Sequence, residues 1–209
     1  MAVIPFYGTD RSGLFAIERA AMDRQGLVIN ALDRLLPDGV VADIGAGDGF
    51  TAERLTTPRR WVVPLEPAAA MIRPDRILPW VQADAEHLPF GPAILDGVYA
   101  TWAYFFSRGW DPAPGLKELR RAIRSQGTIA IVDNLGGDEF TALSDRDITA
   151  DVDFWTARGF ELEIIETAFV FESLHDAQAL LGFYFGDRGR DGARLRVGFR
   201  AGIFVAHPT

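Results

Sequence analysis

Three glycines at alternate positions follow a short apolar run, a spacing typical of a loop that binds a ligand through its backbone. Residues 40–44 are rich in β-branched and apolar types, which indicates a strand. Gly45, Gly47 and Gly49 come next, and glycine lets a backbone turn sharply and approach a ligand without an intervening Cβ atom. A helical pattern begins near residue 50, so free N–H groups of its first turn would face the crevice above the sheet. The segment predicts a nucleotide-type site.

The spacing of the glycines and the acids beside them separate two classes of ligand. Dinucleotide-binding folds use G-x-G-x-x-G, whereas Phe50 stands at the third dinucleotide position here. Asp43 and Asp48 accompany the loop, and no arginine or lysine lies between residues 35 and 53. A pyrophosphate would meet like charge there. A ligand with ammonium and sulfonium centres fits better, and a nicotinamide-dependent oxidoreductase is the disfavoured alternative.

Strands and helices alternate around this loop. Helical spacing covers residues 14–36, 50–57, 68–72 and 115–124, and strand patterns cover 61–66, 80–84, 94–101 and 127–134. Strands that alternate with helices imply a mostly parallel sheet with right-handed crossovers.

The C-terminal third changes character. Helical patterns at 144–158 and 176–185 alternate with β-rich runs at 160–171 and 194–206. Two terminal strands joined by a helix suit an antiparallel edge on a parallel sheet. The expected fold is therefore α/β: a Rossmann-like, doubly wound sheet of seven strands, mostly parallel with an antiparallel C-terminal edge strand and helices on both faces.

Composition bounds the organisation and the partners. A chain of 209 residues with a net charge of −8 suits one domain, with an N-terminal helical segment (1–36), a ligand-binding core (37–134) and a C-terminal substrate-side half (135–209). The negative charge disfavours a nucleic-acid partner, and the absence of cysteine excludes disulfides and thiolate metal sites. Without a basic leader or a long apolar run, the expected location is cytoplasmic, with no membrane partner. No metal site is expected, and the sequence gives no oligomeric state.

The signature D-x-G-x-G-x-G at 43–49 makes the chain resemble class I S-adenosylmethionine-dependent methyltransferases of the small UbiE or methyltransferase-11-like group. The resemblance covers roughly residues 38–134 in order and the rest loosely. It implies S-adenosylmethionine as the cofactor and S-adenosylhomocysteine as its product. It also implies that Asp43, Gly45, Ala46 and Gly47 cradle the methionine part of the cofactor.

The resemblance continues at the ends of the next strands. Glu66, seventeen residues after Gly49, matches the acid that holds both ribose hydroxyls, and Pro67 begins the segment that flanks the adenine. The Asp84 position accepts from the adenine amino group, and the Ala85 N–H meets a ring nitrogen. Thr101 lies at the end of the fourth strand, which in the family borders the cofactor. The usual proline-glycine-glycine turn keeps only its last glycine, Gly127, which affects a turn and not the cofactor site.

The implied reaction is an in-line displacement on the sulfonium methyl group, in which alignment and exclusion of water supply most of the rate. Candidate bases, in order, are Asp133 at the end of the fifth strand, His87 and Tyr104. Candidate substrate contacts are Tyr7, Trp102 and Tyr104. Each has a purely structural alternative. His87 suits a solvated loop, the aromatic residues suit a core, Tyr7 suits a mobile terminus, and Asp48 suits a helix cap.

The acceptor is expected to be a small molecule. No Asn/Asp-Pro-Pro-aromatic tetrapeptide follows the fourth strand and no cysteine exists to attack a cytosine ring, so DNA methylation is disfavoured. A catalytically degenerate protein of the same fold, which binds the cofactor for regulation, is the other alternative.

Overall fold

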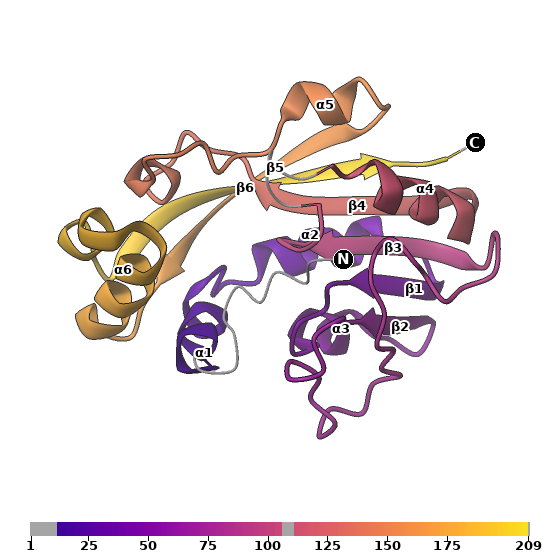
Figure 1. The fold of residues 1–209 in the computed structure, drawn as a ribbon, viewed down its shortest axis with the longest axis horizontal. Coiled ribbons are helices and arrows are strands. Elements are labelled where there is room, and N and C mark those ends of the chain that lie inside the picture. The colour runs from indigo at the N-terminus through magenta and orange to yellow at the C-terminus, as the bar shows by residue number, and fades with distance from the viewer. Residues whose placement is uncertain (1–11, 106–110, 209) are drawn as a thin grey trace. The chain divides into compact units, whose positions relative to one another are not determined.

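The described chain forms an α/β fold around one mixed sheet (Figure 1). The computed structural model describes residues 12–105 and 111–208. The helices are α1 (Ser12–Ala21), α2 (Leu27–Leu35), α3 (Phe50–Leu55), α4 (Ala113–Ala122), the 3-10 turn η1 (Thr141–Leu143), α5 (Val152–Thr156) and α6 (Leu174–Asp191). The strands are β1 (Gly39–Ile44), β2 (Arg60–Leu65), β3 (Leu95–Thr101), β4 (Ile123–Asn134), β5 (Glu161–Val170) and β6 (Arg196–Ala206).

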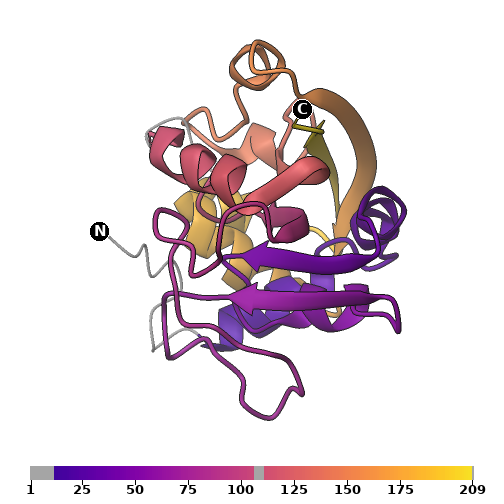
Figure 2. The ribbon, with the colours of Figure 1, turned by 90° about the vertical axis from the view of Figure 1, so that its right-hand side faces the viewer.

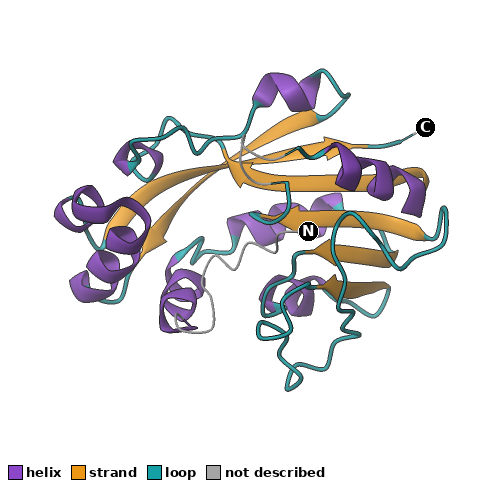
Figure 3. Cartoon of the chain, viewed as in Figure 1, coloured by secondary structure: helices purple, strands orange, loops and turns teal. Residues whose placement is uncertain are grey.

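The sheet has the strand order β2-β1-β3-β4-β6-β5, and its first four strands are parallel. Figure 3 shows the six strands in orange, and Figure 2 shows β1 and β2 side by side with their arrowheads pointing the same way. Residues 95–100 of β3 are all buried, as expected for a central strand covered on both faces. The α/β class and the parallel core predicted from the sequence are confirmed.

One C-terminal strand, β6, is antiparallel to this core. The Gln126 N–H, near the start of β4, donates to the carbonyl of Pro208, beyond the end of β6, at 2.6 Å. The Leu135 N–H, just past the end of β4, donates to the carbonyl of Arg200, near the start of β6, at 2.9 Å. The two strands therefore run in opposite directions.

β6 lies inside the sheet and β5 forms its edge. The Phe171 N–H, just past the end of β5, donates to the Leu195 carbonyl, just before β6, at 2.8 Å, so β5 runs antiparallel to β6 and parallel to the core. The predicted antiparallel strand is therefore present, but its predicted place at the edge is wrong.

The described chain has six strands and not the seven expected, because the run at 80–84 contributes a single bridge. Val81 pairs with Leu65 in parallel fashion, and its N–H donates to the Pro64 carbonyl at 3.0 Å. The Trp80 N–H donates back to Leu78 instead. Asp84 turns the chain away by accepting the Glu86 N–H at 2.8 Å. These local turns end the pairing after one residue.

The helical segment predicted at 14–36 consists of two helices, α1 and α2. Asp23 interrupts it with a φ of 48°, and Gly26 follows with a φ of 70°. The Asp23 carboxylate accepts the N–H groups of Leu27 and Val28 at 3.0 and 2.8 Å. This carboxylate caps α2 and stabilises the break.

Two other predicted helices are wrong in extent. Residues 68–72 form only turns: the N–H groups of Met71 and Ile72 donate to the carbonyls three residues before them, and Pro74 prevents continuation into a helix. The segment 144–158 holds only α5, which begins where the Asp151 side chain accepts the Phe154 N–H at 2.9 Å.

The chain divides into two compact units, each made of discontinuous segments. Unit 1 comprises Met1–Val28, Asn134–Ala150 and Ile164–Ala201, and unit 2 comprises Ile29–Asp133, Asp151–Glu163 and Gly202–Thr209. Unit 2 contains β1, β2 and β3, so it holds the glycine loop. In unit 1 the Phe140 ring stacks on Phe169 with centroids 4.6 Å apart and meets Phe199 at 5.3 Å. The single-domain organisation stays a prediction.

None of the described helices is both long enough and apolar enough to cross a bilayer.

Candidate cofactor site

The glycine loop begins where β1 ends and is held by the neighbouring strand. The N–H groups of Gly45 and Ala46 both donate to the Leu65 carbonyl at 2.9 Å. Gly45, Gly47 and Gly49 have φ values of 72°, 57° and 76°, which lie in the region that favours glycine. A Cβ at Gly45 would lie 2.5 Å from that of Ala103. The sequence needs glycine here for both backbone angle and space.

Glu66 connects the end of β2 to this loop. Its side chain accepts the Gly47 N–H at 2.9 Å through Oε2 and the Ala68 N–H at 2.8 Å through Oε1. The residue is 7% exposed, and burial raises the pKa of its carboxyl group above the ordinary value, while the two backbone hydrogen bonds oppose that rise. Each oxygen keeps a second lone pair, so Glu66 can still accept hydroxyl donors.

A second acid, Asp84, opens the loop 84–90. Its Oδ1 accepts the Glu86 N–H and lies 3.1 Å from Nδ1 of His87. The side chain of His87 is 76% exposed, and Ala85 is buried. The imidazole is therefore solvent-exposed beside a carboxylate that, by the family resemblance, is expected to contact adenine.

The strand ends bring further predicted residues to one edge of the sheet. Thr101 of β3 is paired with Val132 of β4, so Asp133 follows it by one position. Asp43, one residue before the end of β1, pairs with Tyr99 of β3. The side chains of Asp43 and Asp133 are buried, at 1% and 2% exposure. The carboxyl edge is therefore acidic, as the sequence indicates.

Two predicted substrate contacts follow β3. Trp102 has a φ of 46°, which is rare for a bulky residue and marks backbone strain held by its surroundings. Its N–H donates to the Val132 carbonyl at 3.0 Å. The Tyr104 hydroxyl donates to Oε1 of Glu86 at 3.1 Å. Tyr7, the third predicted contact, lies outside the described residues.

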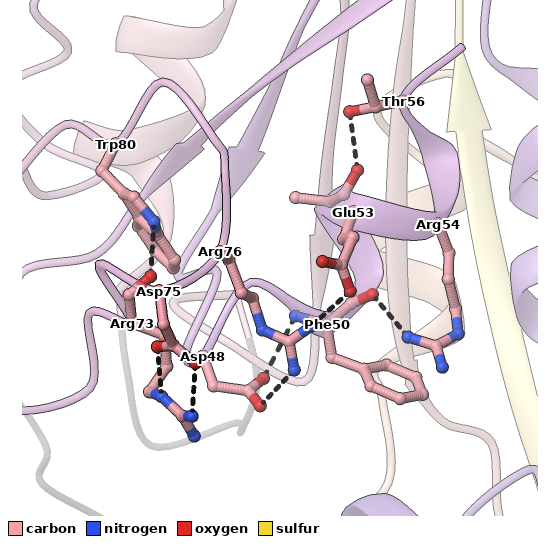
Figure 4. Close-up of polar contacts among 10 residues, drawn as sticks. Asp48, Phe50, Glu53, Arg54, Thr56, Arg73, Asp75, Arg76 and Trp80 are labelled. Atoms are coloured by element: carbon pink, nitrogen blue, oxygen red, sulfur yellow. Dashed lines mark hydrogen bonds and ion pairs between the residues drawn. The ribbon is translucent and has the colours of Figure 1, made fainter.

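Sequence reasoning missed Arg76 (Figure 4). This side chain pairs with Asp48 of the glycine loop at 3.3 Å and with Glu53 of α3. The arginine is 28 residues beyond Asp48 in the chain, so inspection of the loop's neighbours in sequence could not find it. The loop's acidity is thus partly neutralised on the side of Asp48, whereas the hydrogen bonds of Glu66 described above are to backbone N–H groups.

Trp80 also reaches the glycine loop. A Cβ at Gly49 would lie 2.7 Å from Cζ2 of Trp80 and 2.9 Å from Cδ1 of Leu78. The indole Nε1 donates to the Arg73 carbonyl at 3.1 Å. Together with Arg76, the segment 73–80 packs against the loop from the side of α3.

A hollow of about 300 Å³ lies elsewhere, in unit 1. It is lined by residues between Gly137 and Thr149, and none of the predicted site residues lines it.

The middle of the chain matches a known family. Residues 42–131 match the family model described as a methyltransferase domain, which confirms the resemblance inferred from the motifs. No curated protein matches the chain.

Solved structures with the same fold are numerous. A chain of an S-adenosylmethionine-dependent methyltransferase from Thermotoga maritima aligns with a TM-score of 0.62 and 17% identity, covering 97% of each chain. The YcgJ protein of Bacillus subtilis aligns with a TM-score of 0.58 and 17% identity, and the alignment covers 88% of this chain and 97% of that protein. A third match comes from the complex of the Haloferax volcanii Trm112 methyltransferase activator with a methyltransferase. One chain of that complex aligns with a TM-score of 0.60 and 17% identity, and the alignment covers 100% of both chains. At such low identity, these matches show a shared fold.

Proposed function

We propose, from the match of residues 42–131 to a methyltransferase domain and from the motifs that resemble S-adenosylmethionine-dependent enzymes, that this protein methylates a small-molecule acceptor with S-adenosylmethionine. The observation that carries the proposal is Glu66, which is buried beside the glycine loop and bound to its Gly47 N–H. The resemblance of the motifs implies that this position holds the ribose of the cofactor.

The residues at the carboxyl edge fit the cofactor's chemistry. Glu66 retains acceptor capacity for two ribose hydroxyls, and Asp84 offers a carboxylate to the adenine amino group with the Ala85 N–H beside it. Asp43 is a buried carboxylate at the loop that suits an ammonium group. Pro67, Ala46 and Thr101 complete the proposed contacts. A pyrophosphate would face these acids with unfavourable Coulomb energy.

When bound, S-adenosylmethionine supplies an electrophilic methyl group on a sulfonium sulfur. It would transfer this methyl group to an O, N, C or S atom of the acceptor and leave as S-adenosylhomocysteine. The acceptor's proton, where it has one to lose, passes to a base or to water. The chain's own task is to align the acceptor and exclude water.

The proposed bases are Asp133, then His87 and Tyr104. Asp133 is buried at the end of β4, where a carboxylate can take a proton from an acceptor placed beside Thr101. His87 is largely exposed and paired with Asp84, and the Tyr104 hydroxyl already donates to Glu86. Both observations favour Asp133 as the first choice.

The proposed acceptor is a small molecule that contacts Trp102, Tyr104 and Tyr7. The Thermotoga maritima neighbour is described as a possible histamine N-methyltransferase, and small acceptors of this kind suit an aromatic wall. The negative net charge of the chain argues against a nucleic-acid acceptor.

Calorimetry tests the cofactor half of the proposal. S-adenosylhomocysteine and S-adenosylmethionine should bind wild type and NADH should not, and Glu66→Ala should weaken S-adenosylhomocysteine by at least ~10-fold through loss of a charged acceptor. The matched control is Glu161→Ala, an exposed glutamate at the start of β5, which should leave affinity unchanged. No binding by wild type, or unchanged binding in Glu66→Ala, refutes the proposal.

A turnover screen tests the reaction. Wild type with S-adenosylmethionine and a metabolite pool should release S-adenosylhomocysteine in an acceptor-dependent way. A protein that binds the cofactor but gives no product with any acceptor would instead be the degenerate, binding-only alternative.

A further inference from the structure

A pair of charged side chains on α4 holds the second half of the loop 84–90. Oε2 of Glu118 accepts the Leu88 N–H at 3.0 Å. The Arg121 guanidinium donates to the Leu88 carbonyl at 3.1 Å and to the Phe90 carbonyl at 2.8 Å. Three backbone groups of the loop are thus satisfied by side chains that lie 30 to 33 residues further along the chain.

The two side chains also bind each other in a fork. Nε of Arg121 donates to Oε1 of Glu118, and Nη2 donates to Oε2, both at 2.8 Å. The hydrogen bond from Arg121 holds the pKa of Glu118 below its ordinary value, so the carboxylate stays ionised at neutral pH. Bidentate geometry of this kind is directional and stronger than a simple contact of charges.

The loop 84–90 contains no helix or strand that could bond these backbone groups instead. Between the bridge at Val81 and the start of β3, the chain forms only turns and irregular backbone. Leu88 is 5% exposed, and a buried backbone amide without a partner would cost about 1–3 kcal/mol. Glu118 and Arg121 therefore replace a strand ladder at this point.

The opposite half of the same loop carries the proposed adenine contacts. Asp84 and Ala85 lie only four and three residues before Leu88. Between them and Leu88, Glu86 is bound by the Tyr104 hydroxyl, and the Tyr104 ring packs on α4, where a Cβ at Gly115 would lie 2.3 Å from its Cε1. Both halves of the loop are therefore tied to α4.

We propose that Glu118 and Arg121 are positioning residues for adenine recognition: by fixing Leu88 and Phe90 they hold Asp84 and Ala85 in register with the adenine edge. This inference rests on the proposed cofactor function. It predicts a loss of discrimination between bases, which a role confined to general stability would not produce.

The test compares S-adenosylhomocysteine with its hypoxanthine analogue, S-inosylhomocysteine, by calorimetry. Wild type should prefer the adenine compound, because its amino group donates to Asp84. Arg121→Gln should lower the affinity for S-adenosylhomocysteine by ~10-fold and bring the ratio of the affinities for the two compounds close to one. Arg121→Lys should behave in the same way, because a single ammonium group cannot reproduce the fork.

Arg120→Gln is the matched control. Arg120 is exposed on the same helix and carries the same charge, so its variant should keep both affinities and their ratio. For Glu118→Gln, the ratio of the two affinities should lie between the ratios of Arg120→Gln and Arg121→Gln. A ratio that stays at the wild-type value in Arg121→Gln overturns the inference, even if both affinities fall together.

Amide hydrogen exchange separates this inference from the proposed function. Arg121→Gln should speed exchange at Leu88 relative to wild type, whether or not a ligand binds. If wild type binds neither compound, the proposed function fails while the exchange result still tests the hold on the loop. Unchanged exchange at Leu88 overturns the inference by itself.

Discussion

Glu66 combines a structural task and a proposed binding task in one carboxylate. It bonds two backbone N–H groups, one in the glycine loop and one just after itself. Its type and its place at a strand end were visible in the sequence, but its hydrogen bond to Gly47 was not, because no local pattern reports a contact across 19 residues. Burial of this group has a consequence for pH.

As the pH is lowered, the affinity for the cofactor should begin to fall at a higher pH than it would if Glu66 had the ordinary pKa of a glutamate. Because burial raises the pKa of folded Glu66, its contribution to stability is present at low pH and is lost as pH rises through the folded-state pKa. Binding has the opposite dependence, since ribose hydroxyls need the ionised acceptor. Calorimetry of S-adenosylhomocysteine, with the pH lowered from neutrality to the ordinary glutamate pKa, should show wild-type affinity falling before that pKa is reached.

Glu66→Gln is the companion variant for this titration. It should bind weakly with an affinity that varies little over the same range. Wild-type affinity that stays constant down to the ordinary glutamate pKa would contradict the expected effect of burial.

At the scale of elements, Arg60 at the start of β2 joins the ends of two helices. Its guanidinium donates to the carbonyls of Asp33 and Leu36 near the end of α2 and to the carbonyl of Leu55, the last residue of α3. It also bonds the Asp33 carboxylate at 2.6 Å, and its side chain is 6% exposed. One buried side chain thus satisfies carbonyls that each helix leaves without a partner.

Arg60→Met should therefore lower the free energy of unfolding by about 3 kcal/mol, mainly by leaving these carbonyls unsatisfied. The neighbouring Arg59 gives the control, because its side chain is 81% exposed and pairs with Asp38 at the surface. Arg59→Met should cost less than about 0.5 kcal/mol. Urea unfolding measures both, and equal losses would contradict the assigned role of Arg60.

The glycine loop itself should tolerate no side chain at Gly45. Gly45→Ala combines a positive φ with a Cβ that would lie 2.5 Å from that of Ala103, so we expect a loss of about 2–4 kcal/mol. Gly159 has a φ of 82°, but a Cβ there would have no atom within 4 Å. Gly159→Ala should lose only about 1 kcal/mol, the cost of the backbone angle alone. Similar losses in the two variants would show that space at Gly45 does not matter.

Sequence patterns predicted the elements that depend on local periodicity and missed those decided by side chains. Continuous apolar runs indicated the buried parallel strands, and the alternation after residue 194 indicated β6. The predicted helix at 68–72 is wrong because Pro74 leaves room for only short turns between Glu66 and the proline. The break between α1 and α2 depends on the left-handed conformation of Asp23, which few sequence signals reveal.

At the scale of the whole molecule, the chain passes repeatedly between the two units. It changes unit after Val28, Asp133, Ala150, Glu163 and Ala201. Neither unit is a continuous stretch, and β5 and β6 each have residues in both. This threading supports the proposal of a single domain.

Unfolding should accordingly be one cooperative transition. Far-UV and near-UV circular dichroism should give the same urea midpoint, and Arg60→Met in unit 2 should move both. Tyr184→Phe, which removes a hydrogen bond to Glu18 inside unit 1, should also move both midpoints together. Two separate transitions, or a variant that shifts only one probe, would contradict the single-domain proposal.

The contact between Trp80 and Gly49 has a practical consequence. The indole lies against the backbone of the glycine loop, whereas Trp61 is 61% exposed and Trp155 is 3% exposed. The fluorescence of Trp80 is therefore a built-in optical reporter of the loop. The difference in emission between wild type and Trp80→Phe would follow movements of Gly49 without any attached dye.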